Sequence, residues 1–252
     1  EKGEEWISTG GFIITYCILA RSQAQLPHYI FVVLPLAAIV TARTIYQLLF
    51  EKNYKTLTNI LYWVHLVLFL LLWIAAVALM IWPFPAMHLV IKILAITGLV
   101  CYLFLLIKPF QQLPKLLQMA LFTVIGVNLC LVSGFYPQLL KYQLGNTVAA
   151  VLEEKKVDKT KVVQYNIDES RALHFYGKRI FKHITDSTQI HATDILLTKK
   201  ESLPALKQRF PDLNTIFEGT YYGVSMLSLP FLNPKTRDKE TIPYVLIDMD
   251  GR

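Results

Sequence analysis

One stretch of the chain reads Val64-His65-Leu66-Val67-Leu68-Phe69-Leu70-Leu71-Leu72-Trp73, and His65 is its only residue that is not apolar. It lies within an apolar run, residues 57–82, which exceeds the roughly 20 residues that a helix needs to cross a bilayer. Trp63 and Trp82 are placed like the aromatic residues that anchor a helix at the membrane interface. We therefore predict a transmembrane helix here, with His65 packed in the bundle or reaching towards the interface.

Further apolar segments flank this helix and account for the composition of the whole chain. The sequence is 54% hydrophobic, with a mean hydropathy of +0.42, which is too apolar for an ordinary soluble domain. The other segments are residues 6–20, 28–50, 87–107 and 116–136, and Pro137 closes the last of them, just after Gly134. The sequence therefore predicts an α-helical transmembrane bundle of about five helices over residues 1–137.

The remainder, residues 138–252, alternates between helical and strand patterns and is predicted to be a small α/β domain on a mixed sheet. The expected helices are residues 138–154, 170–176 and 201–210. The expected strands are residues 161–167, 179–184, 195–198 and 243–248, with one or two more in residues 217–229. Asp168 or Ser170 can cap the second of these helices.

The charges of the connecting segments predict on which side of the membrane this domain lies. Arg43, Lys52 and Lys55 mark one face, and Lys108 and Lys115 mark the same face when the helices alternate in direction. Because basic residues accumulate in cytoplasmic loops, this face is predicted to be cytoplasmic. The tail after Pro137 is then extracytoplasmic, and so is the loop that follows the first apolar segment.

The sequence argues against several other classes of protein. The net charge is +7, but the basic residues are mixed with acids and form no stripe for nucleic acid. Residues 6–20 lack the basic start and the cleavage site of a signal peptide, so we expect the chain to be the C-terminal piece of a longer membrane protein. Cys17, Cys101 and Cys130 lie inside apolar segments, too far apart to suggest a motif, which predicts small buried side chains.

Two groups of titratable residues in the tail invite a chemical interpretation. The first has potential metal ligands over a short stretch: His183, Asp186, His191 and Asp194. Their spacing fits no known zinc pattern, and a strand followed by a polar loop explains them, so no metal site is predicted. The second combines Asp168, Glu169 and His174, which suit acid–base catalysis or, alternatively, a helix cap and a solvated face.

A polar loop between the first two apolar segments is the remaining candidate site: Arg21-Ser22-Gln23-Ala24-Gln25-Leu26-Pro27-His28-Tyr29-Ile30. A guanidinium offers a planar fork of donors that suits phosphate, and a Tyr hydroxyl is a donor on an amphipathic ring. Arg21, His28 and Tyr29 could therefore bind an anionic lipid headgroup. The alternative is an aromatic belt with Arg21 extended towards the interface.

The same loop resembles a motif of bacterial GT-C membrane glycosyltransferases. Residues 25–30, followed by Pro35-Leu36-Ala37-Ala38, are similar to "Lys-Leu-Pro-x-Tyr-Ile-Leu-Pro … Pro-Leu-Ala" in the family of the lipid A aminoarabinose transferase and the dolichyl-phosphate-mannose-protein mannosyltransferases. Tail positions resemble the extracytoplasmic domain of many members, in the same order: Tyr142-Gln143, Tyr165, Phe175-Tyr176, Leu197-Thr198 and Phe231-Leu232-Asn233-Pro234. The resemblance covers nearly the whole chain.

This resemblance implies an enzyme of the bacterial inner membrane that transfers a sugar from a polyprenyl-phosphate-linked donor to a lipid A-like glycolipid or a protein. It implies that Tyr29 lies beside the phosphate of the carrier. Gln25 stands where the family usually has Lys, and Gln23 stands where it often has another. As a separate hypothesis, without a family motif behind it, Arg21 would supply the missing cation. The family's catalytic acids lie in an earlier outer loop without a counterpart here, so no catalytic residue is predicted in this chain. No cofactor is implied, and a need for a divalent metal is left open.

Two other functions compete with this interpretation. A non-catalytic membrane protein whose outer α/β domain binds a partner would be insensitive to changes in the loop from Arg21 to Tyr29. A transporter bundle would carry charged or broken helices near the middle of the membrane, and the apolar segments of this chain do not favour that arrangement.

Overall fold

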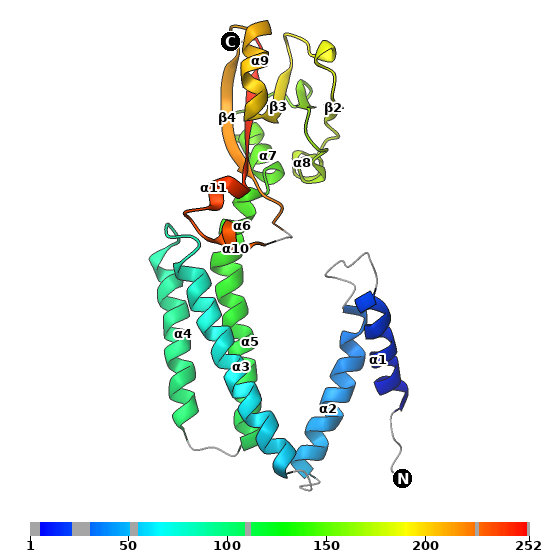
Figure 1. Ribbon diagram of the computed structural model, residues 1–252, viewed down its shortest axis with the longest axis vertical. Helices are drawn as coiled ribbons and strands as arrows, with labels where there is room; N and C mark the ends of the chain where they lie inside the picture. Colours follow the sequence, from blue (N-terminus) through cyan, green and yellow to red (C-terminus); the bar gives the residue numbers. More distant parts are fainter. Residues whose placement is uncertain (1–5, 22–30, 51–54, 109–111, 225–226, 251–252) are drawn as a thin grey trace. The chain divides into compact units, whose positions relative to one another are not determined.

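The computed structural model describes residues 6–21, 31–50, 55–108, 112–224 and 227–250, and it is mostly helical with one small sheet (Figure 1). The first five helices are α1 (Trp6–Arg21), α2 (Leu34–Phe50), α3 (Lys55–Ile81), α4 (Leu89–Ile107) and α5 (Gln112–Cys130). Contacts divide the chain into two compact units. One combines residues 1–69 and 108–121, and the other combines residues 70–107 and 122–252.

Three helical segments of the described residues are long and apolar enough to cross a membrane. They are Lys55–Ile81, Leu89–Ile107 and Pro114–Tyr142. The first two lie within two residues of the predicted segments 57–82 and 87–107 at each end. Helices α1 and α2 form where the first two segments were expected, but with 16 and 17 residues they are shorter than a full span.

The apolar segment predicted over residues 116–136 runs further than expected. This corrects the expectation that Gly134 and Pro137 end it. After α5 the chain forms a π-helical turn, η2 (Leu131–Phe135), and continues through α6 (Tyr136–Leu139) and η3 (Leu140–Tyr142). Pro137 lies in the first positions of α6, where a missing backbone N–H is best tolerated. The π turn shifts the hydrogen-bond register just before the proline, so the helix passes it without ending. The helical run therefore crosses position 137, and the domain boundary placed there stays a prediction.

A single tryptophan holds three of these helices together in the second unit. Trp73 of α3 is 2% exposed, and its ring lies 5.4 Å from the ring of Phe122 in α5. A Cβ added to Gly98 of α4 would overlap the Trp73 ring, and a Cβ added to Gly126 of α5 would lie 2.7 Å from Trp73 Cη2. The two glycines thus form a hole that the indole ring fills, which is the small-residue packing typical of membrane helices.

The tail combines helices with a small five-stranded sheet, and its separation as an α/β domain stays a prediction. Its helices are α7 (Gly145–Glu154), α8 (Arg171–Gly177), α9 (Leu203–Arg209), α10 (Leu229–Leu232) and α11 (Arg237–Glu240), with short turns η4 (Ser187–Gln189) and η5 (Lys200–Ser202). Its strands are β1 (Val162–Tyr165), β2 (Lys182–Ile184), β3 (Ile195–Lys199), β4 (Asn214–Tyr221) and β5 (Ile242–Asp248). The strand order is β2-β1-β3-β5-β4. Strand β1 is parallel to β2 and β3, whereas β5 is antiparallel to β3 and β4, so the sheet is mixed.

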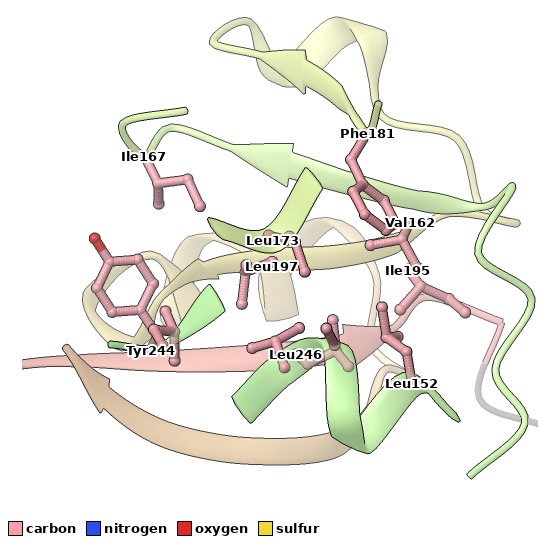
Figure 2. Packing of buried hydrophobic residues seen from close by; sticks show 12 residues of the cluster. Leu152, Val162, Ile167, Leu173, Phe181, Ile195, Leu197, Tyr244 and Leu246 are labelled. Carbon is pink, nitrogen blue, oxygen red and sulfur yellow. The ribbon is translucent and has the colours of Figure 1, made fainter. Parts of the chain in front are cut away.

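Both faces of the sheet are buried, because alternate residues of the central strands enter different cores. Val162, Leu197 and Leu246 pack with α7 and α8 on one face (Figure 2). The neighbouring residues Val163, Leu196 and Val245 pack with Leu206 of α9 on the other. Central strands covered on both faces are nearly continuously apolar, which is the pattern that made β1, β3 and β5 recognisable in the sequence.

Three predicted elements of the tail have different bounds. The helix expected over residues 138–154 is interrupted at Gln143, whose ψ of 44° ends η3. The strand expected over residues 179–184 is confined to β2, because Lys178 closes α8 in a left-handed conformation (φ 55°) and the chain needs the next residues to turn. The strand expected to reach residue 229 ends at Tyr221, and Ser228 instead caps α10 by accepting a hydrogen bond from Phe231 N–H.

Candidate functional site

The predicted phosphate-binding loop lies mostly outside the described residues. Arg21 is the last residue of α1 and is exposed, whereas His28 and Tyr29 fall outside the described ranges. A cation at the C-terminal end of a helix is electrostatically favourable, and an exposed guanidinium there can also reach a ligand. The assignment of Arg21, His28 and Tyr29 to a lipid phosphate stays a prediction.

The residues considered as metal ligands have other partners in the tail. His183 Nε2 donates to the carbonyl oxygen of Ile167 at 2.6 Å, and Asp194 Oδ2 accepts from the backbone N–H of His191 at 2.8 Å. Asp186 caps η4, and the hydrogen bond from the backbone N–H of Thr188 lowers its pKa below the usual range. Within the described ranges, no three His, Cys, Asp or Glu residues come together in a way that could hold a metal ion.

The group Asp168, Glu169 and His174 forms a local structure at α8. Ser170 caps the helix, so the cap falls to the second of the two predicted residues. Glu169 Oε1 lies 2.9 Å from His174 Nε2, and His174 Nδ1 accepts from the backbone N–H of Phe181 at 3.0 Å. The ring proton must therefore be on Nε2, and both nitrogens are engaged. Because no nitrogen is left to accept a proton from a substrate, the arrangement does not suit a general base.

Burial, followed by the charges of Asp168, Tyr221 and Glu201, raises the pKa of Tyr244 to about 12 from its usual value of 10.0. Because the pKa of Tyr244 is higher in the folded protein than in the unfolded chain, the fold favours the neutral phenol. The stability that depends on the neutral phenol is complete below pH 10 and declines as the pH rises to 12. The total loss is about 2–3 kcal/mol. In Tyr244→Phe, the free energy of unfolding should fall less over this pH range. Tyr176→Phe, at an exposed tyrosine of the same domain, is the control, and equal pH dependence in all three proteins would contradict the assignment.

An apolar cavity of about 340 Å³ lies in the first unit among α2, α3 and α5. Its walls are mostly aliphatic and aromatic, with polar groups from Thr41, Thr44, Thr58, Tyr62 and His65. The other lining residues are Val40, Ile45, Leu48, Leu61, Phe69, Leu116, Leu117 and Ala120.

The polar groups of this cavity are partly turned back to their own helices. Thr44 Oγ1 donates to the carbonyl oxygen of Val40 at 2.9 Å, and His65 Nδ1 donates to that of Leu61 at 2.7 Å. These bonds satisfy hydroxyl and ring donors without a ligand, so the interior stays predominantly apolar. The cavity is therefore suited to a segment of a hydrocarbon chain. His65 is part of its wall, which agrees with its expected place within the bundle.

The second unit contains a buried arginine that the sequence did not indicate. Arg237 of α11 is 9% exposed and donates from Nε to the carbonyl oxygen of Phe231 at 2.9 Å. Its Nη2 donates to the carbonyl oxygens of Pro83 and Leu232, and its Nη1 lies 3.3 Å from the hydroxyl of Tyr142. The guanidinium carbon lies 4.6 Å from the ring centre of Phe84.

Aromatic rings complete a cage around this guanidinium. Its carbon is 5.3 Å from the ring centre of Phe231 and 5.6 Å from that of Tyr142. The rings of Tyr142 and Phe231 meet edge to face at 5.1 Å, and Tyr222 stacks on Phe231 at 3.7 Å. No carboxylate is within ion-pair distance of Arg237 among the residues that the structure describes. The charge is therefore stabilised by carbonyl dipoles and ring quadrupoles, an arrangement that only the flat Arg side chain can satisfy.

The Arg237 cage connects parts of the chain that are distant in sequence. Pro83 and Phe84 belong to the turn between α3 and α4, Tyr142 ends the long apolar helix, and Phe231 belongs to α10. This places α10 and α11 against the end of the helical hairpin, and the chemistry is that of a structural clamp. The only sequence signal was the pair of aromatic positions in the resemblance, Tyr142 and Phe231, since Arg237 itself lies in an ordinary charged run, Arg237-Asp238-Lys239-Glu240.

Comparison of the chain with models of protein families, with curated proteins and with solved structures finds no match. Conclusions on function therefore rest on the geometry of the chain and on the motifs of its sequence.

Proposed function

We propose that the chain is part of an integral membrane glycosyltransferase of the GT-C type. It would transfer a sugar from a polyprenyl-phosphate-linked donor to a lipid A-like glycolipid or a protein at the outer face of a bacterial inner membrane. The α/β domain would lie on that outer, periplasmic side. Catalysis is not assigned to any residue of this chain.

The contact between Tyr142 and Phe231 is the observation that supports this proposal most. Both positions belong to stretches of the tail that resemble the family. They lie far apart in the chain, yet their rings are 5.1 Å apart and enclose the same guanidinium. If the resemblance were accidental, there would be no reason for two of its positions to lie in the same cluster.

The apolar cavity among α2, α3 and α5 supports the lipid part of the proposal. A polyprenyl carrier is a long hydrocarbon chain with a phosphate at one end, and it needs an apolar surface for the chain. The cavity has this character and is about as large as the smaller ligand pockets of proteins. It would hold a portion of the carrier, while the phosphate would be bound by Arg21, His28 and Tyr29.

The proposed chemistry places charge on the phosphate as the bond to the sugar breaks. Donors that already point at the phosphate stabilise this charge in the transition state, and Arg and Tyr are suitable donors. A carboxylate outside this sequence would accept the proton of the attacking group. Loss of one donor should therefore reduce the rate of transfer, rather than only the affinity for the donor.

The test is transfer of labelled sugar from a polyprenyl-phosphate donor by the full-length protein in membranes. Tyr29→Ala and Arg21→Ala are each expected to lower kcat/KM at least about tenfold, a loss of about 1.4 kcal/mol of transition-state stabilisation. Tyr16→Ala, at an exposed position of α1, and Arg209→Ala, at an exposed position of α9, are controls that should retain activity. The amount of folded protein is matched by size-exclusion chromatography.

The outcomes separate the proposed enzyme from its competitors. If the wild type and all four variants transfer equally, the phosphate site is assigned wrongly although the enzyme class stands. If the wild type transfers no sugar from any donor tested, the enzyme class fails. The alternative is then a non-catalytic membrane protein whose outer domain binds a partner.

A further inference from the structure

The segment from α8 to β2 exposes large apolar side chains on the surface of the tail domain. Phe175 is 76% exposed, Tyr176 is 51% exposed and Ile180 is 82% exposed. The rings of Phe175 and Tyr176 meet edge to face at 5.2 Å, so they form one patch. Three such residues within one short segment are unusual for a surface that contacts only water.

The fold holds these side chains outwards. Leu173 and Gly177 of α8 are buried, and Leu173 packs into the core that α8 shares with α7, so the opposite side of this short helix faces away from the domain. After the left-handed turn at Lys178 the chain alternates, with Phe181 buried in the same core and Ile180 pointing out. The exposure therefore follows from well-packed neighbours and is a fixed property of the fold.

The same surface is basic. The exposed cationic residues are Arg171, Lys178, Arg179 and Lys182, and the sequence from 171 to 182 contains no acid. The acids beside it have local partners, and those that accept hydrogen bonds from neutral groups keep their negative charge. Glu169 pairs with His174 at 2.9 Å, Glu153 pairs with Lys159 at 2.6 Å, and Asp158 accepts hydrogen bonds from Thr160. Glu153 and Asp158 are close enough to Lys178 and Arg179 to sense their charge, and the four exposed cations outnumber the three carboxylates Glu169, Glu153 and Asp158.

This surface, formed by the segment from α8 to β2, lies close in sequence and in space to the end of a helix that is long enough to cross a membrane. The apolar run Pro114–Tyr142 has 29 residues, or about 43 Å of helix, which exceeds the roughly 30 Å of hydrocarbon and reaches the headgroup region. Gly145 begins α7 three residues after Tyr142, so the two are at most about 11 Å apart. A Cβ on Gly145 would lie 2.6 Å from Leu173 N, so the start of α8 touches it directly. Figure 1 shows α8 beside α7.

We propose that the α8–β2 surface rests on an anionic lipid bilayer, with Phe175, Tyr176 and Ile180 inserted at the headgroup level. Aromatic and aliphatic side chains ringed by Lys and Arg are the composition of surfaces that lie in the interface of anionic membranes. Each basic residue near such a membrane is attracted by its negative surface potential. The contact fixes the domain against the membrane in which its own helices are embedded, and it does not depend on sugar transfer.

Lipid-specific quenching in nanodiscs tests this contact in the full-length protein. A bimane label is placed at Ile180→Cys, with Asp212→Cys in the exposed turn between α9 and β4 as the control. Both are made with Cys17, Cys101, Cys130 and any cysteine of the full-length protein outside this sequence replaced by alanine, so that the label is specific. The nanodiscs contain brominated lipid and either zwitterionic lipid alone or about one anionic phosphatidylglycerol in three lipids.

With anionic lipid, we expect quenching at position 180 to be at least about threefold greater than at position 212. Arg179→Gln combined with Lys182→Gln should reduce the difference, as should zwitterionic lipid. Both charges are exposed, so circular dichroism should show an unchanged fold. Equal quenching at both positions in every lipid would overturn the contact. Strong quenching at position 180 that is equal in anionic and zwitterionic lipid would overturn the electrostatic part of the proposal. A label that neither brominated lipid nor aqueous iodide quenches would show that protein covers the surface, which would overturn the contact with lipid.

Discussion

Replacing Gly98 with alanine is expected to lower the stability of the protein in detergent by about 1–3 kcal/mol, although alanine is a better helix former than glycine. The added methyl group would overlap the ring of Trp73. The ring has nowhere to move, because Gly126 lies against it on another helix and Phe122 is 5.4 Å from it. The clash must therefore be relieved by separating α3 from α4, which loses packing contacts between these helices.

Gly10→Ala is the matched control for this substitution. Gly10 also lies within an apolar helix, α1, but a Cβ there meets no atom within 4 Å. Its replacement should leave the melting temperature unchanged or raise it, since only helix propensity changes. Thermal unfolding of both variants, followed by the loss of monodisperse protein on heating, separates the two effects. Equal melting temperatures for Gly98→Ala and Gly10→Ala would show that the fit around Trp73 does not limit stability.

A second substitution identifies the side chain that causes the clash. Trp73→Leu makes room for a methyl group at position 98, so the double variant should lose less than the sum of the two single losses. Such coupling of about 0.5–3 kcal/mol is expected only for residues in contact. Additive losses would mean that Gly98 acts through another neighbour.

The elements that the sequence predicted correctly are those whose signal is local. The apolar runs over α3 and α4 are long enough to cross a membrane, and strands β1, β3 and β5 are apolar on both faces. Ser170 caps α8 through its own hydroxyl, which is a contact within a few residues. In each case the residues that determine the element are inside it, so periodicity and capping rules suffice.

The elements that were missed depend on other parts of the chain. A proline and a glycine usually end a helix, but here the π turn before Pro137 preserves it, and Gly134 is held against Met80 and Ile91 of neighbouring helices. The role of Trp73 depends on glycines from two other helices. Sequence patterns describe which residues prefer an element and do not describe which distant residues will fill the space around it.

The candidate sites show the same division. The loop with Arg21 and Tyr29 was predicted as a site because its residues are consecutive in sequence and a motif is a local signal. It stays a prediction, since Tyr29 lies outside the described residues. Arg237 could not be recognised, because its partners come from positions near 83, 142 and 231 and its own surroundings in sequence are ordinary. A basic residue in a charged run is typical of a solvated helix, and only the fold shows that this one is buried.

Replacing Arg237 with alanine is expected to destabilise the tail domain by about 3 kcal/mol, because it leaves the carbonyl oxygens of Pro83 and Phe231 buried without their donor. Arg237→Lys should lower the stability by nearly as much. An ammonium group has the same charge, but it cannot lie flat between Phe84 and Phe231 while donating in several directions of one plane. A requirement for charge alone would instead make Arg237→Lys close to the wild type, so this pair of variants distinguishes the geometry of the cage from its electrostatics.

The measurement is the rate of trypsin cleavage of the folded protein in detergent, which reports opening of the domain, together with its melting temperature. Arg209→Ala is the control, because Arg209 is exposed and donates one hydrogen bond, to Ser187 O at 2.6 Å, so its loss should cost no more than about 0.5 kcal/mol. Tyr142→Phe removes only the hydrogen bond of 3.3 Å from Arg237 and keeps the ring. Its cleavage rate and melting temperature should lie between those of Arg237→Ala and Arg209→Ala. If Arg237→Ala is cleaved and melts like Arg209→Ala, the clamp does not hold α10 and α11 to the helical hairpin. If cleavage accelerates first near α10 and α11, the clamp is what keeps these two helices in place against the end of the helical hairpin.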